Sequence, residues 1–131
     1  MEEPRLRAEF RRLFRKLNRR KQEEFLQHIY ETRRQKESDK HKNQFFIKSA
    51  KNGDLETVKR LLSEGADVNT TDKKLGNSAL FYAVIKEDLN MVMYLLEKRA
   101  DPKQKNKKGT NPITAAIYLG NKEIISCLKN N

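Results

Sequence analysis

The stretch GDLETVKRLLSEGADVN, residues 53–69, returns 34 positions later as EDLNMVMYLLEKRAD, residues 87–101. An aspartate-leucine pair, a valine, a leucine pair and an alanine-aspartate pair coincide in the two copies. A third, shorter copy follows, in which Gly120, Ile125 and Leu128 continue the same pattern. Self-similarity at a fixed period of this length predicts a stack of identical supersecondary units.

Apolar spacing inside each copy predicts a helix. Leu55, Val58, Leu61 and Leu62 are separated by three, four and seven positions, which places them on one helical face. The second copy repeats this stripe. Ser78 precedes another apolar run and is expected to cap its first turn by accepting from backbone amides. The fold class predicted from these patterns is all-α.

These residues resemble the ankyrin repeat from about Gln44 to the C-terminus. Residues 49–69 read SAKNGDLETVKRLLSEGADVN, and residues 76–83 and 109–116 read GNSALFYA and GTNPITAA, where the family has its TPLH-type helix starts. The resemblance implies an ankyrin-repeat solenoid of about three repeats, which is a binding scaffold. The expected repeats are residues 41–72, 73–105 and 106–131.

The middle repeat departs from the family pattern at two helix ends. Glu87 stands where the neighbouring repeats have Gly53 and Gly120, and Arg99 stands where the first repeat has Gly65. If both residues keep a positive φ, each costs about 1 kcal/mol. We therefore expect the middle repeat to be less well capped than its neighbours.

Residues 1–40 are predicted to form a basic amphipathic helical extension. Two apolar stripes, one over residues 6–17 and one over residues 25–30, are out of phase at about 100° per residue. Either two helices meet near residues 18–21, or one helix contacts different partners along its length. Because a repeat stack needs its terminal apolar face covered, residues 25–30 are expected to cap the apolar opening of the first repeat, residues 45–47.

Nine lysines and arginines but one acid, Glu9, lie between Arg5 and Lys21. Such a helix suits a solvated basic face, an acidic protein, nucleic acid or an anionic membrane. Its apolar stripe also allows oligomerisation through the N-terminal helices. The residues expected to contact an anionic partner are Arg5, Arg11, Arg12, Arg15, Lys16, Arg19 and Arg20.

The main candidate site follows from the resemblance, because ankyrin domains usually bind through hairpin fingers and exposed positions of the first helices, which line a concave face. Ile85 and Tyr118 would be apolar anchors on that face, and the second finger is rich in lysine. This combination favours a protein partner with an acidic surface. The expected contact residues are Lys51, Asn52, Lys74, Leu75, Asn77, Ile85, Lys86, Lys107, Lys108, Thr110, Tyr118 and Leu119.

Charge, cysteine content and the absence of catalytic motifs limit the classes of function that are expected. The formal net charge is +11, which favours anionic partners. A single cysteine, Cys127, suits an intracellular compartment, cytoplasmic or nuclear, and no signal peptide or membrane-spanning run is predicted. His28 and His41 with one distant cysteine predict no metal site, and no nucleophile motif or phosphate loop is present, so neither enzymatic activity nor a cofactor is expected.

The chain ends in the second helix of the third repeat, without a polar capping repeat. Its outer apolar face would then be exposed, or used for self-association, or covered by a further part of a longer protein.

Overall fold

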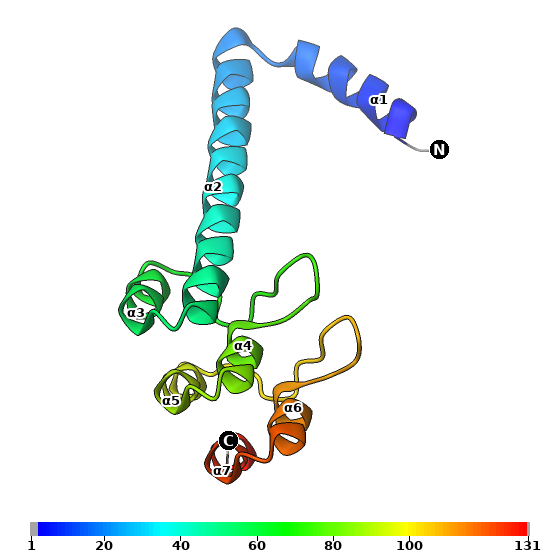
Figure 1. The fold of residues 1–131 in the computed structure, drawn as a ribbon. Coiled ribbons are helices and arrows are strands. Elements are labelled where there is room, and N and C mark those ends of the chain that lie inside the picture. Colours follow the sequence, from blue (N-terminus) through cyan, green and yellow to red (C-terminus); the bar gives the residue numbers. More distant parts are fainter. Residues whose placement is uncertain (1–2, 131) are drawn as a thin grey trace. The chain divides into compact units, whose positions relative to one another are not determined.

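The computed structural model describes residues 3–130 and shows seven helices among them (Figure 1). Within this range the only extended pairing is an isolated bridge between Thr71 and Ser78. Two compact units divide the chain at residues 38 and 39. The helices are α1 (Glu3–Lys16), α2 (Arg19–Lys51), α3 (Leu55–Ser63), α4 (Ala79–Ile85), α5 (Leu89–Glu97), α6 (Pro112–Leu119) and α7 (Lys122–Lys129).

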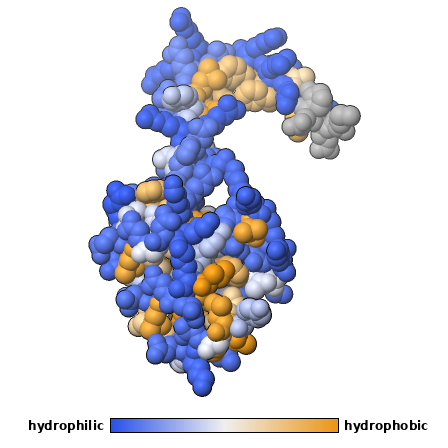
Figure 2. Space-filling view, in the orientation of Figure 1, coloured by the Kyte–Doolittle hydropathy of each residue, from blue (hydrophilic) through white to orange (hydrophobic). Residues whose placement is uncertain are grey.

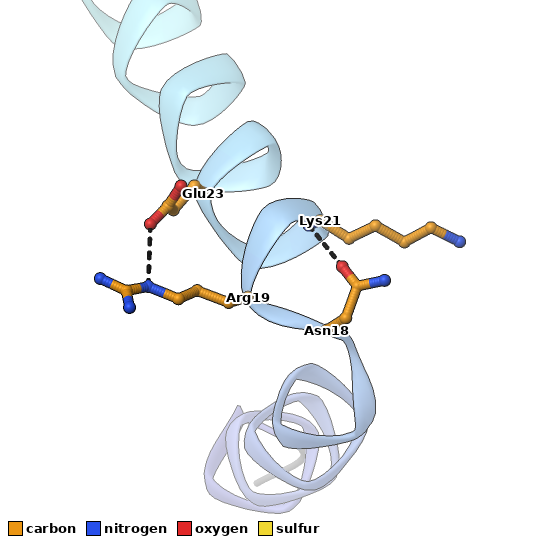
Figure 3. A network of polar contacts seen from close by, with 4 residues as sticks. All are labelled: Asn18, Arg19, Lys21 and Glu23. Atoms are coloured by element: carbon orange, nitrogen blue, oxygen red, sulfur yellow. Dashed lines mark hydrogen bonds and ion pairs between the residues drawn. The ribbon is translucent and has the colours of Figure 1, made fainter.

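The break between α1 and α2 falls at Leu17 and Asn18 and is held by side-chain caps. The Asn18 carboxamide oxygen accepts a 2.9 Å hydrogen bond from the Lys21 amide and so caps the start of α2 (Figure 3). From the first turn of α2, the Gln22 carboxamide donates to the carbonyls of Phe14 and Leu17 at 2.9 and 3.1 Å. These bonds satisfy the Lys21 amide at the start of α2 and add donors to two carbonyls at the end of α1, where the regular helical pattern stops.

Three phenylalanines join the two helices of the first unit. The rings of Phe10, Phe14 and Phe25 lie with centroids 5.5 to 5.9 Å apart, within the range of favourable aromatic contacts. Phe25 is therefore engaged with α1, whereas Leu26 and Tyr30 keep 55% and 63% of their surface exposed. A capping contact between this segment and the opening of the first repeat stays a prediction.

α2 continues through the expected boundary at residues 40 and 41 and ends only at Lys51. Its last turns belong to the second unit, where Phe46, Ile47 and Ala50 are buried. The first repeat thus opens directly from a helix rather than from a hairpin, in keeping with its lack of a TPLH-type start. Phe46 is fully buried and anchors this end of the repeat core.

The repeat core lies between two rows of helices. α4 packs on α5 and α6, while α7 packs on α5 and α6. The apolar stripes predicted from the sequence face inward: Val58, Val92 and Leu95 have no exposed surface (0%). The predicted all-α solenoid is therefore confirmed.

Short polar side chains start each repeat helix from α3 to α7. In every case the cap side chain accepts from the backbone amide three residues later, which satisfies one of the free donors of the first turn. The expected cap at Ser78 is confirmed. The capping residues are Asp54, Ser78, Asp88, Asn111 and Asn121.

Two loops project from the repeat unit beside α4 and α6 (Figure 1). We call residues 69–77 the first finger and residues 103–111 the second finger. They contact each other closely, because the Lys107 amide donates to the Leu75 carbonyl at 3.1 Å. Gly76 permits this approach: its φ is +71°, and an added Cβ would lie 3.1 Å from the Lys107 nitrogen.

Glu87 and Arg99 adopt φ values of 55° and 70°, so both glycine-type slots of the middle repeat keep their left-handed backbone. The corresponding Gly53 and Gly65 have φ values of +75° and +99°. A side chain with Cβ is strained in this region, whereas glycine is not. Both helix ends of the middle repeat therefore carry the backbone strain that is expected to weaken their capping.

We expect Arg99→Gly to stabilise the chain by about 0.5–1 kcal/mol, since the relief of left-handed strain exceeds the added entropy of an unfolded glycine. Urea unfolding followed by circular dichroism measures the change. The reciprocal control is Gly65→Arg, which should be destabilising because the slot has a φ of +99°. The space around Gly65 is open, so the loss would report backbone strain and not a steric clash. Equal stability of all three proteins would show that these helix ends carry no strain.

Candidate functional site

A groove between the end of α2, α4 and the first finger is lined by lysines; we call it the lysine groove. Its volume is ≈ 650 Å³. Three of the predicted contact residues, Lys51, Lys74 and Leu75, line it. The full lining is Gln44, Ile47, Lys48, Lys51, Asp72, Lys73, Lys74, Leu75 and Tyr82.

Asp72, the acid in this groove, is committed to the first finger. Its Oδ1 accepts from the amides of Leu75 and Gly76 at 2.7 and 2.8 Å and from that of Asn77 at 3.4 Å, while Oδ2 accepts from the Tyr82 hydroxyl. Burial alone would raise the pKa of Asp72, but the hydrogen bonds from Tyr82 and the three amides outweigh it and lower the pKa. The carboxylate therefore shapes the finger as an anion.

The cations of the lysine groove are crowded. The neighbouring side chain of Lys40 lowers the pKa of Lys73, because two ammonium groups beside each other repel. Lys51 holds its ammonium 5.3 Å from the centre of the Tyr82 ring. A surface that brings like charges together in this way is electrostatically suited to an anionic group.

A second groove lies between α4 and α6 and is largely apolar; we call it the apolar groove. Its volume is ≈ 360 Å³, and apolar atoms gather over α4 and α6 in Figure 2. Tyr118 stands at this groove with 90% of its surface exposed, and Ile85 is 46% exposed. The lining residues are Phe81, Ile85, Thr110, Thr114, Ala115, Tyr118 and Leu119.

The structure brings together most of the predicted concave-face residues, on two sides of α4. Tyr82 of α4 lines the lysine groove, whereas Phe81 and Ile85 of the same helix line the apolar groove. Lys51, Lys74 and Leu75 fall in the first groove, and four predicted residues fall in the second. These four are Ile85, Thr110, Tyr118 and Leu119.

Two predicted contact residues have structural roles instead. Asn77 is only 5% exposed, and its side-chain oxygen accepts a 2.9 Å hydrogen bond from Asn106 in the second finger. The inclusion of Asn77 among the partner contacts was therefore wrong, because its side chain joins the two fingers. The Lys107 ammonium donates to the Lys73 carbonyl, so this lysine also ties the fingers together.

The other predicted residues, Asn52, Lys86 and Lys108, are exposed but line neither groove. Sequence reasoning missed Lys48 and Tyr82, which line the lysine groove, and Phe81, which lines the apolar groove. The helical register offered a signal for Tyr82, which follows one turn after the Ser78 cap. Lys48 lies in the degenerate opening of the first repeat, where no family pattern marks the exposed positions.

The predicted anionic-contact residues of the first unit are all exposed: Arg5, Arg11, Arg12, Arg15, Lys16, Arg19 and Arg20. Three of them form ion pairs on the helix surface. Arg12 lies 3.8 Å from Glu9, and Arg19 and Arg20 lie 3.3 and 3.2 Å from Glu23 and Glu24. Exposed pairs of this kind are weak, so they leave the arginines available to stronger anions.

The part of the chain that the structure describes offers no group of three or more His, Cys, Asp or Glu side chains placed to hold a metal ion. Within the same residues, none of the helices has the length and apolar character required to cross a membrane. Cys127 is half-buried in α7.

Residues 46–131 match the sequence model of a family described as ankyrin repeats in three copies. The chain therefore belongs to the ankyrin-repeat family. Proteins of this family generally bind other proteins and are generally not enzymes, and the repeats are the part of the chain to which that statement applies.

Similar sequences occur within much longer proteins. The chain is 36% identical over 80 residues to the potassium channel AKT1 of Arabidopsis thaliana, which is 61% of this chain and 9% of the channel. It is 35% identical over 78 residues to the human 2-5A-dependent ribonuclease, covering 60% of this chain and 10% of the ribonuclease. Putative ankyrin repeat protein L271 of Acanthamoeba polyphaga mimivirus is 34% identical over 84 residues, or 63% of this chain and 11% of the viral protein. The chain thus covers about a tenth of each relative's length, and the likeness concerns the repeats.

Proposed function

We propose that the repeats bind a protein segment that carries acidic residues next to a large apolar side chain. The observation that supports this most directly is the position of the two grooves, which share α4 as a common wall. One groove offers ammonium groups and the other offers an open apolar surface. A segment with both chemistries would satisfy the two grooves together.

The lysine groove supplies the electrostatic part of this recognition. Lys48, Lys51, Lys73 and Lys74 line it, while the acid among them, Asp72, is held by the amides of its own finger. Carboxylates or phosphates of a partner would relieve the repulsion between neighbouring ammonium groups. Charge complementarity of this kind mainly accelerates association and excludes basic partners.

The apolar groove supplies the anchor. Tyr118 has 90% of its surface exposed although it is a large amphipathic side chain, which is the residue type that most often dominates binding energy in interfaces. A partner side chain placed between Tyr118, Ile85 and Leu119 would bury apolar surface from both sides. The lysines then act as a charged rim around an apolar centre, as in many protein interfaces.

We expect Tyr118→Ala to weaken binding of such a segment by about 10- to 50-fold, the loss typical of an aromatic hot spot. The ligand is obtained by selecting peptides from a random display library on the full chain. Fluorescence polarisation then gives the dissociation constants. Peptides rich in Asp or Glu beside Phe, Leu, Ile or Trp are expected.

The matched control is Ile117→Ala, because Ile117 lies next to Tyr118 in α6 and is 54% exposed but does not line the groove. Its effect should stay within about twofold. Selected peptides that are basic, or equal losses for the two variants, would contradict the proposed site.

A second candidate function is recognition of a phosphate-rich partner such as nucleic acid by the arginines of α1. The dependence of binding affinity on salt concentration distinguishes the two candidate functions. Binding through many phosphate contacts falls steeply as salt rises, whereas an interface anchored by Tyr118 and Ile85 should weaken far less. An intracellular site of action is part of the proposal and is supported by the single cysteine.

A further inference from the structure

α1 presents a continuous apolar face to its surroundings. Leu6, Phe10, Leu13 and Leu17 keep 59%, 48%, 51% and 38% of their surface exposed. At about 100° per residue Leu6, Phe10 and Leu13 fall within about 60° of one another on the helix, and Leu17 directly follows its last residue, Lys16. Apolar side chains also gather along this part of the molecule in Figure 2.

Cations border this face on both sides. On the same helical projection Arg7 stands beyond one edge; beyond the other stand first Glu9 and then Lys16 and Arg5. Between Arg5 and Lys21 the sequence has nine lysines and arginines against one acid, Glu9, which lies 3.8 Å from Arg12. The long aliphatic parts of such side chains can follow an apolar layer while their charges reach anionic groups above it.

We propose that α1 lies in the surface of anionic lipid membranes, with Leu6, Phe10, Leu13 and Leu17 towards the acyl chains and the arginines at the headgroups. A helix with a strong apolar face, a basic polar face and low overall hydrophobicity is suited to this interfacial position. Apolar insertion and attraction to anionic headgroups are two independent contributions, and together they are what stable peripheral binding requires.

Other occupants of this face fit the charges and the exposed surface less well. Two copies of the chain joined by their α1 faces would bring together the six cations of α1 from each copy. A nucleic acid would neutralise the arginines but leave the leucines in water. A bilayer offers apolar and anionic layers at once and needs no surface of matching shape, and α1 at 14 residues is short enough to lie on it rather than to span it.

The test compares two variants of the full chain that change the net charge equally. Leu13→Glu places a carboxylate on the apolar face, whereas Ala8→Glu places one on the opposite, exposed face. Flotation uses vesicles of phosphatidylcholine alone and vesicles containing about 30% phosphatidylserine, at about 0.15 M salt. Circular dichroism checks that both variants remain helical.

The unaltered chain is expected to float with the phosphatidylserine vesicles and much less with phosphatidylcholine alone. Leu13→Glu should bind at least about tenfold more weakly than Ala8→Glu, because only the former opposes insertion. Equal losses for the two variants would show that binding is purely electrostatic and would overturn the interfacial position. Absence of binding to the anionic vesicles would overturn the proposal entirely.

A spectroscopic reading tests insertion separately. The chain has no tryptophan, so Leu6→Trp introduces a single probe on the apolar face. Its emission should shift to the blue with anionic vesicles and be quenched by brominated acyl chains; an unchanged spectrum would contradict insertion. Sedimentation without lipid is expected to show a monomer, and a dimer abolished by Leu13→Glu but not by Ala8→Glu would assign the face to a second copy instead.

This inference is independent of the grooves on the repeats. Tyr118→Ala should leave vesicle binding unchanged, and Leu13→Glu should leave peptide binding unchanged.

Discussion

Leu95→Ala is expected to destabilise the repeats by about 3 kcal/mol, within the usual range of 2–5 kcal/mol for such truncations. Leu95 lies in α5 of the middle repeat and has no exposed surface (0%). Removing its isobutyl group loses the transfer free energy of the buried atoms and leaves a cavity that close-packed neighbours fill only in part. Urea unfolding followed by circular dichroism measures the loss.

The control for this prediction is Met93→Ala on the same helix, because Met93 is 52% exposed. Its effect should stay within about 0.5 kcal/mol, as for most surface substitutions. If Leu95→Ala were as stable as Met93→Ala, the inward face of α5 would have to be assigned differently.

Asp72→Ala is expected to cost about 2–3 kcal/mol, since hydrogen bonds to a charged acceptor are worth more than neutral ones and several donors lose their partner at once. Three backbone amides and the Tyr82 hydroxyl would be affected. The matched control is Asp101→Ala, whose carboxylate accepts from the Lys103 amide at 2.9 Å, and its cost should be smaller, about 1 kcal/mol.

The contribution of Asp72 should depend on pH in a direction fixed by its pKa. The folded chain lowers this pKa, so the stabilisation is fully present above the ordinary value of about 3.9 and is lost as pH falls through the lower folded value. The difference in unfolding free energy between the unaltered chain and Asp72→Ala should therefore shrink below about pH 4. A difference that grew on acidification would contradict the charge state assigned to Asp72.

Much of the repeat fold could be predicted because its determinants are local and periodic. The stripe of Leu55, Val58 and Leu61 sets which face is buried, and Ser78 caps its helix through a bond within one turn. The positive φ values of Glu87 and Arg99 followed from glycines at matching positions. Each of these features needs only nearby residues or a copy at a known distance.

The parts that escaped prediction depend on contacts between distant residues. Asn77 occupies an exposed position by register, yet the Asn106 carboxamide of the next finger donates a hydrogen bond to its side-chain oxygen. The finger formed around Asp72 likewise requires Tyr82, ten positions away, to complete it. α2 passes the expected boundary near residue 40 because nothing in that charged, glycine-free sequence ends a helix.

The central claim is that the two grooves beside α4 receive the partner. Amide chemical shifts of the isotopically labelled full chain, recorded while a selected peptide is added, test it most directly. The account predicts the largest changes at Lys51, Leu75, Ile85, Tyr118 and Leu119, with little change along α1, α3 and α5. Changes confined to α1, or to the outer surface of α3 and α5, would contradict it.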